Sequence, residues 1–251
     1  MRTAAVIATT LVIVTGFAMI IPLFLRPGIV EPKQRVMISF SVLPSSEANE
    51  WCQNLSSLLN AQDIGASVFF VGKVAEQYPQ AVSYFSDKVD VGSQTYSNLD
   101  LTGTSDYSVK LQEIKEGKMA VDNAGNLYSR VFRAPLGATD EDIYSLLNQS
   151  GILADFSYKI QYNVYQNGQF VKYDAAVYEA RDYPPDFFPI LSQNMSPAII
   201  VVDNSYSVSD IATLISALKK ADVEFVNASE LTGLTLTIRG GGFVDSKIDS
   251  N

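Results

Sequence analysis

Asp90-Val91-Gly92-Ser93-Gln94-Thr95-Tyr96-Ser97-Asn98-Leu99-Asp100-Leu101-Thr102 is the stretch in which a short apolar run ends and a polar loop begins. In parallel α/β folds the functional site lies at the carboxyl ends of the strands, so such a loop is the first place to look for chemistry. The whole chain contains no histidine. Imidazole chemistry therefore cannot be supplied to this loop from any other part of the sequence.

Length and composition limit the architecture and the partners. With 251 residues the chain is long enough for one large α/β domain and an anchor, but short for two full domains. Its 27 acidic residues outnumber its 18 basic ones, which gives a net charge of -9 and argues against a nucleic-acid partner. The single cysteine, Cys52, cannot form a disulfide within the chain.

The amino-terminal segment is strongly apolar. Between Arg2 and Arg26 there is no charged residue, and a helix of this length spans a hydrocarbon core of about 30 Å. A cleaved signal peptide is the alternative, but its apolar region is usually shorter, roughly 7–15 residues. We therefore expect residues 1–26 to form a transmembrane anchor in contact with membrane lipid and residues 27–35 to form a linker. The charges that flank the apolar segment do not determine its orientation.

Strands and helices alternate through the rest of the sequence, which predicts parallel βαβ units. Ser45 and Ser46 are candidate N-caps of the first helix in this part, and Gly65 is its expected end. The pair Asn167-Gly168 between alternating apolar residues predicts a hairpin with a type I′ turn. About seven strand-helix units result, which favour a distorted barrel over an open sheet. We expect residues 36–234 to form this domain and residues 235–251 a polar tail. The expected strands are 36–40, 66–71, 131–133, 152–156, 198–202 and 224–226.

The polar loop resembles the second signature of the polysaccharide deacetylases, which reads Gly-Asn-His-Thr-Tyr-Ser-His-Pro-Asp-Leu-Thr. In that family the two histidines, four residues apart, hold a divalent metal. Gln94 and Asn98 occupy these positions here. The resemblance implies a distorted (β/α)7 barrel, and it also implies that this chain lacks the imidazole ligands of the family metal site.

The other signatures follow in the same order. The first, Thr-Phe-Asp-Asp in the family, supplies a catalytic base and a metal ligand, and here it reads Ser39-Phe40-Ser41-Val42. The third, Arg-x-Pro-x-Gly, is kept as Arg133-Ala134-Pro135-Leu136-Gly137. In the last signature, Asp203 replaces the histidine that acts as the general acid. We expect Arg133 to pair with another acid or with a carbonyl, because Ser41 replaces its family partner.

The resemblance implies that the chain has the fold of the deacetylases but not their catalytic and metal-binding residues. Catalytic residues and metal ligands are absent at the degenerate positions Ser41, Asp203, Arg133, Val42, Gln94 and Asn98, and no cofactor is implied. We expect Ser41, Gln94, Asn98 and Asp203 to lie near one another, with Val42 packed beside them. Tyr96, Arg133 and Asp203 are the candidate binding residues.

Two functional hypotheses follow from this sequence. The first is a single-pass membrane protein whose inactive domain lies outside the cytoplasm and serves as a binding or scaffolding subunit, with membrane-protein partners or a cell-surface glycan. The alternative is a carbohydrate-active hydrolase with relocated catalytic carboxylates, led by Asp203 and including Asp155 and Asp174.

Overall fold

The computed structural model describes residues 33–139, 142–184 and 197–240. From Gln34 onward these residues belong to one compact unit. The anchor expected in residues 1–26 lies outside the described residues. Within the described ranges, no helix is both long and apolar enough to cross a membrane.

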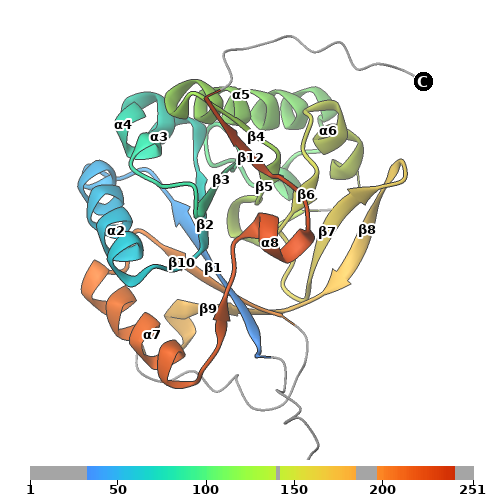
Figure 1. The fold of residues 1–251 in the computed structure, drawn as a ribbon. Coiled ribbons are helices and arrows are strands. Elements are labelled where there is room, and N and C mark those ends of the chain that lie inside the picture. Colours follow the sequence, from blue (N-terminus) through green and yellow to red (C-terminus); the bar gives the residue numbers. More distant parts are fainter. Residues whose placement is uncertain (1–32, 140–141, 185–196, 241–251) are drawn as a thin grey trace, which may run out of the picture. The chain divides into compact units, whose positions relative to one another are not determined.

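Strands and helices alternate along the first two thirds of this unit (Figure 1). The elements are β1 (Arg35–Val42), α2 (Ala48–Gln62), β2 (Ala66–Phe70), α3 (Gly72–Gln77), α4 (Pro79–Ser83), β3 (Val89–Ser93), η1 (Leu101–Gly103), α5 (Tyr107–Gly125), β4 (Leu127–Ser129), β5 (Val131–Phe132), η2 (Pro135–Gly137), α6 (Ile143–Gln149), β6 (Ala154–Asp155), β7 (Gln161–Gln166), β8 (Gln169–Asp174), β9 (Ala176–Glu179), η3 (Ala180–Asp182), β10 (Ala198–Asp203), α7 (Val208–Lys220), β11 (Glu224–Phe225), α8 (Ala228–Thr232) and β12 (Thr237–Arg239).

One sheet forms a nearly closed barrel. Its strands follow the order β8-β7-β6-β5-β3-β2-β1-β10-β9, and β11 pairs with the start of β1. The strands from β6 to β9 along this path are parallel, whereas β7 and β8 form an antiparallel hairpin. β8 and β9 are the two ends of the path, and Ala175 alone connects them along the chain. The α/β barrel-like architecture expected from the sequence is therefore present. The sheet is open between β8 and β9, and the chain crosses this opening at Ala175.

The hairpin at Asn167-Gly168 is confirmed. Both residues have positive φ angles, 52° and 86°, as a type I′ turn requires. Gln166 and Gln169 are paired on either side of them. Asn and Gly tolerate the left-handed region better than other residues, so this dipeptide determines the register of the two strands.

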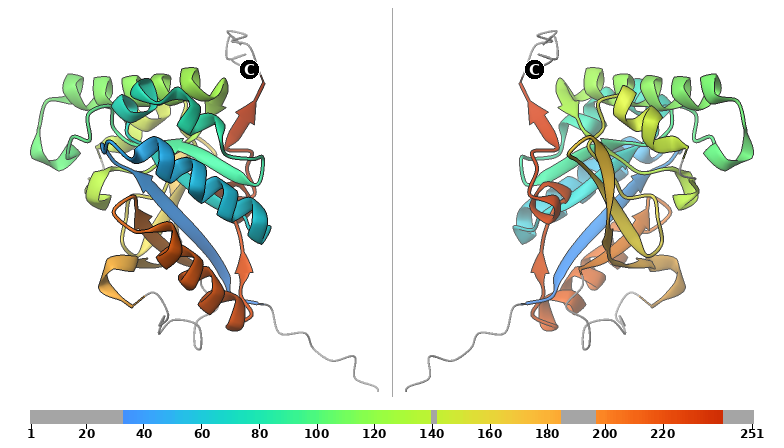
Figure 2. Two further views of the ribbon diagram at one scale, coloured as in Figure 1. Left: turned by 90° about the vertical axis from the view of Figure 1, so that its left-hand side faces the viewer. Right: turned by 90° about the vertical axis from the view of Figure 1, so that its right-hand side faces the viewer.

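The hydrophobic core has two main parts, one on each side of the sheet. In β1 the even-numbered residues from Val36 to Val42 belong to a cluster that includes apolar residues of α2, α4, α5 and α7. Met37 belongs to a second cluster with Phe69 and Ile199. Because side chains alternate across a strand, this second set faces the barrel interior. Figure 2 shows the helices outside the strands from two sides.

Both ends of α2 differ from the sequence prediction. Its N-cap is Glu47, which makes no side-chain capping bond, and not Ser45 or Ser46. The Ser45 hydroxyl accepts a hydrogen bond from the Glu47 backbone N–H instead. The helix ends at Asp63 in the left-handed region (φ 56°), before Gly65 is reached. Aspartate tolerates this conformation, so the glycine is not needed as the cap.

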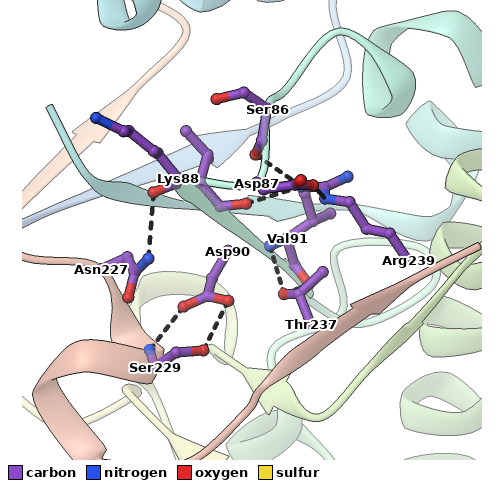
Figure 3. A network of polar contacts seen from close by, with 10 residues as sticks. Ser86, Asp87, Lys88, Asp90, Val91, Asn227, Ser229, Thr237 and Arg239 are labelled. Carbon is purple, nitrogen blue, oxygen red and sulfur yellow. Dashed lines mark hydrogen bonds and ion pairs between the residues drawn. The ribbon is translucent and has the colours of Figure 1, made fainter. Parts of the chain in front are cut away.

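The carboxyl-terminal elements close the amino end of the barrel, where the strands begin. Figure 3 shows Asp90 of β3 accepting hydrogen bonds from the backbone N–H (2.6 Å) and the hydroxyl (2.9 Å) of Ser229 in α8. Thr237 and Arg239 of β12 also bond to main-chain groups of the β3 segment. The sequence prediction that places residues 235–240 in a polar tail is wrong for this part, because β12 pairs with β4. A three-residue strand is too short to give a periodic signal.

We predict that Ser229→Ala destabilises the domain. The substitution removes the hydroxyl that bonds to Asp90, itself only 5% exposed, and that accepts a hydrogen bond from Leu236 N–H at 3.0 Å. The free energy of unfolding should fall by about 1–3 kcal/mol, because buried groups lose their partner. Chemical denaturation measures this, with Ser57→Ala on the exposed face of α2 as the control. Equal losses in the two variants would contradict the assigned role of Ser229.

Candidate functional site

The carboxyl ends of the parallel strands form the barrel mouth, and two signature positions meet there. Ser41 of β1 and Asp203 of β10 are direct register partners. On its other side Ser41 is paired with Phe69 of β2. The structure therefore brings the first and last signature segments together at one edge of the sheet, as the βαβ pattern predicts.

Ser41 and Val42 point to opposite sides of β1. Ser41 is 8% exposed and belongs to the interior-facing set with Ser39, which is fully buried. Val42 is fully buried in the hydrophobic cluster between the sheet and the helices. The expectation that Val42 packs beside Ser41 in the site is wrong, because successive strand residues face opposite directions.

Gln94 is part of the framework of the barrel wall. Its side-chain amide donates to the Phe69 carbonyl oxygen at 3.1 Å, and its backbone N–H donates to the Phe70 carbonyl at 2.8 Å. Only 1% of the residue is exposed. Gly117 of α5 lies directly against this segment, and a Cβ there would be 2.5 Å from the Gln94 carbonyl oxygen. Through Phe69, which pairs with Ser41, Gln94 lies in the same part of the mouth as Ser41 and Asp203.

Asn98 has a different environment from Gln94. It is exposed and has a left-handed backbone (φ 66°). The loop between the two amides is fixed by Ser97, whose N–H and hydroxyl both donate to Glu113 of α5, at 2.8 and 2.7 Å. Buried Gln94 and exposed Asn98 therefore do not form a matched pair of amides.

The side chain of Tyr96, a candidate binding residue, contacts α3. Its hydroxyl donates to Glu76 at 2.8 Å, and Lys73 lies 5.6 Å from the ring centre. The hydrogen bond to Glu76 raises the pKa of the Tyr96 hydroxyl. At Gly72 an added Cβ would be 2.7 Å from the Tyr96 ring. These contacts give Tyr96 a structural role in holding the loop against α3.

Arg133, at the carboxyl end of β5, pairs with Glu179 at the end of β9. The distance between the guanidinium Nη2 and the Glu179 carboxylate is 3.6 Å, and their side chains are 5% and 25% exposed. Nη1 donates to the Phe156 carbonyl at 2.6 Å. Burial lowers the pKa of the Arg133 guanidinium, and the charges of Glu179 and Asp155 oppose that shift. The prediction that Arg133 reaches another acid or a carbonyl is confirmed on both counts.

Glu179 is a residue that sequence reasoning misses. β9 has only four residues, all half-buried, so it lacks a hydrophobic run that would mark it as a strand. Its end at the barrel mouth becomes evident only from its parallel pairing with β10, in which Glu179 is opposite Val201. The one available signal is an acidic residue just before a turn, and this signal is common on protein surfaces.

Asp155 is completely buried at the end of β6. One carboxylate oxygen, Oδ1, accepts hydrogen bonds from the backbone N–H (3.0 Å) and the hydroxyl of Ser157. The other oxygen, Oδ2, accepts no hydrogen bond that meets normal geometry from the described residues. Burial raises the pKa of Asp155 to about 6, although the bonds from Ser157 and the charge of Arg133 favour the ionised form.

The three carboxylates considered for relocated chemistry have separate environments. Asp203 is half-buried and accepts from the Ser205 N–H at 2.9 Å and from the Ser205 hydroxyl, as in a capped turn. Asp155 is held by Ser157, and Asp174 is exposed on β8. In the described ranges, no group of three or more His, Cys, Asp or Glu residues is arranged to hold a metal ion. A cavity of about 340 Å³ lies at the other end of the barrel, beside Asp87 and Arg239.

The fold and the site together define an α/β barrel whose mouth carries hydroxyls, amides and a buried arginine paired with a partly exposed glutamate. A family profile described as polysaccharide deacetylase matches residues 29–154. The chain therefore belongs to the polysaccharide deacetylase family. No protein with a curated description matches the sequence significantly.

Solved structures share the fold at low sequence identity. A CE4-family pseudoenzyme from Bacillus anthracis has a TM-score of 0.60 at 15% identity, and the match covers 80% of this chain and 66% of that protein. A peptidoglycan N-acetylglucosamine deacetylase has a TM-score of 0.60 at 16% identity, with 81% and 90% covered. The peptidoglycan deacetylase PdaC from Bacillus subtilis has a TM-score of 0.56 at 16% identity, with 80% and 91% covered.

We predict that Glu179→Gln destabilises the barrel by about 1–3 kcal/mol. The substitution removes the carboxylate that forms the ion pair with the buried guanidinium of Arg133 and leaves only the attraction of Asp155. The loss is below the ~3–5 kcal/mol of a fully buried pair because Glu179 is partly exposed. The matched control is Glu224→Gln, which removes an exposed pair with Arg35 at 3.9 Å. That variant should lose less than about 1 kcal/mol. Denaturant titrations measure the free energy of unfolding of both variants. An equal loss in the two would show that the Arg133 pair contributes no more to stability than a surface pair.

Proposed function

We propose that this chain is a catalytically inactive member of the polysaccharide deacetylase family that serves as a membrane-anchored binding or scaffolding subunit outside the cytoplasm. The observation that carries the proposal is the state of the barrel mouth. Where the family signature has a catalytic aspartate, Ser41 offers a hydroxyl, and the signature arginine pairs with Glu179 instead. The framework of the site is kept, while its proton-transfer groups are replaced.

The replaced groups are poor substitutes for the original chemistry. A serine hydroxyl without an adjacent base does not accept a proton near neutral pH, so Ser41 cannot act as a general base. The Gln94 amide is committed to a main-chain carbonyl, and neutral amides lack the charge or the imidazole nitrogen that transition-metal sites use. Asp203 accepts hydrogen bonds from Ser205, and Arg133 forms its ion pair with Glu179.

The membrane part of the proposal rests on the sequence. The uninterrupted apolar segment between Arg2 and Arg26 has the length of a membrane-spanning helix. The linker expected after it ends where β1 begins, at Arg35. A catalytically inactive domain held at a membrane acts through binding, and its partners are membrane proteins or a cell-surface glycan.

A single observation would favour the alternative of a hydrolase with relocated carboxylates. Two carboxylates of the mouth would have to face one open pocket. Asp155 is fully buried against Ser157, and Asp203 caps its own turn. The described residues therefore favour the binding role over this alternative.

We expect the purified full-length chain to bind no zinc, nickel or cobalt stoichiometrically and to release no acetate from acetylated chitooligosaccharides. Metal analysis after dialysis and an acetate assay measure the two properties. The matched variant carries Val42→Asp, Gln94→His and Asn98→His, which supply a carboxylate and two imidazoles of the kind that hold zinc. Val42 faces the core between the sheet and the helices, and Gln94 is buried whereas Asn98 is exposed, so the three new ligands do not converge and this variant should bind zinc no better than the unmodified chain. Metal-dependent turnover by the unmodified chain would refute the proposed inactivity.

The scaffolding role predicts stable partners. When the tagged full-length chain is isolated from detergent-solubilised native membranes, a fixed set of membrane proteins should co-purify at constant ratio. Glu179→Gln provides a comparison, because it alters the barrel mouth and leaves the anchor unchanged. Recovery of the chain alone, across several detergents, would argue against a complex subunit and for a free-standing glycan binder.

A further inference from the structure

The ends of β5 and β6 are fastened to each other at the barrel mouth by the segment 155–157. The hydroxyl of Ser157 donates to Asp155 and accepts a hydrogen bond from the Ala134 N–H at 2.8 Å. Arg133 adds its bond to the Phe156 carbonyl. A Cβ at Gly137 would overlap the Ser157 carbonyl oxygen, so the two segments are in close contact over the whole turn.

The turn held in this way has an unusual conformation. Leu136 has φ 58° and ψ 8°, a left-handed backbone that residues other than glycine, asparagine and aspartate rarely adopt. Its side chain is 72% exposed. An exposed leucine side chain and a left-handed leucine backbone are both energetically unfavourable, so contacts around the turn must stabilise this conformation. Ser157 and Arg133 supply such contacts, beside the backbone hydrogen bonds within the turn, from Gly137 N–H to Ala134 (3.1 Å) and from Ala138 N–H to Pro135 (3.0 Å).

Asp155 is the buried group on which these contacts depend. It is fully buried, and Ser157 donates two hydrogen bonds to its Oδ1, while the side chain of Asn163 also favours its ionised form. Arg133 attracts it without a direct hydrogen bond. The charged form therefore strengthens the Ser157 bonds and the attraction to Arg133, whereas a proton on Oδ2 removes the charge and weakens both.

We propose that Asp155 is a proton-responsive latch that holds the turn from Arg133 to Gly137, and with it the exposed Leu136 side chain, in a fixed position at the barrel mouth. In the ionised state the latch is closed through Ser157 and Arg133. Protonation weakens it, and the turn leaves its left-handed conformation more often. The position of the mouth thus depends on the pH of the compartment into which it opens.

The neighbours of Asp155 are compatible with this proposal. On β7 its register partner is the uncharged Asn163, which favours the ionised form. Burial raises the pKa of Asp155 to about 6, which lies within the range of mildly acidic compartments. The titratable or charged groups on the elements packed around it are Arg133 on β5, Glu179 on β9, Lys172 on β8 and Tyr144 on α6. The Asp155→Asn variant described below separates a transition of Asp155 from any effect of these groups.

Methyl NMR of the full-length chain, recorded between pH 4.5 and 8, tests the latch. The leucine methyl signals of residue 136 are assigned by their loss in Leu136→Ile. We expect these signals to follow a single titration with a midpoint near the pKa of about 6 given for Asp155. Protection of the Ala134 amide against hydrogen exchange, corrected for the intrinsic rate, should fall about tenfold from pH 7.5 to pH 5, since a charge-assisted bond becomes neutral.

Three variants make the test decisive. Asp155→Asn should abolish the titration at Leu136, whereas Asp90→Asn, which changes another buried carboxylate at the far end of the barrel, should leave it in place. Ser157→Ala should raise the midpoint, because the ionised form loses a hydrogen bond while the backbone N–H bond remains. Leu136 signals that do not change with pH, or that titrate alike in Asp155→Asn, overturn the proposal. If Asp155→Asn does not fold, an unchanged midpoint in Ser157→Ala overturns it.

Discussion

The buried guanidinium of Arg133 is the constraint on which the barrel mouth depends. A charge that is 5% exposed needs a counter-charge, and the structure supplies it from Glu179 at 3.6 Å. The pair joins the end of β5 to the end of β9, which lie far apart in the sheet order. It therefore links strands across the interior of a barrel whose edges β8 and β9 are connected only through Ala175.

The same arginine begins the signature turn from Arg133 to Gly137. The signature turn from Arg133 to Gly137 keeps its glycine, because only a residue without a Cβ fits against the Ser157 carbonyl. The carboxylate that the arginine serves in the family is a serine hydroxyl here, at position 41. Glu179, an acidic partner from another strand, holds the arginine at the start of this turn. A signature that is kept in the sequence supports the fold and does not by itself establish an activity.

The two ends of the barrel are stabilised by different means. At the amino end, a buried carboxylate, Asp90, receives two good hydrogen bonds from Ser229, and burial still raises its pKa. At the mouth, Asp155 has one bonded oxygen and one that is left without a hydrogen bond of normal geometry among the described residues. A closed network favours rigidity, whereas an incomplete one leaves a group whose charge state can change at moderate pH.

The sequence by itself determined the local structure of this protein and the side-chain types available to its site. Alternating apolar runs and amphipathic helices required parallel βαβ units, Asn167-Gly168 fixed a hairpin, and the absence of histidine removed the family's imidazole ligands. These properties depend on neighbouring residues, so they can be derived from the chain. The tertiary structure alone decided that Glu179 meets Arg133, that Gln94 is buried while Asn98 is exposed, and that β12 closes the amino end. Each of these depends on which strands become neighbours, and strand order is determined by packing over the whole domain and not by any local pattern.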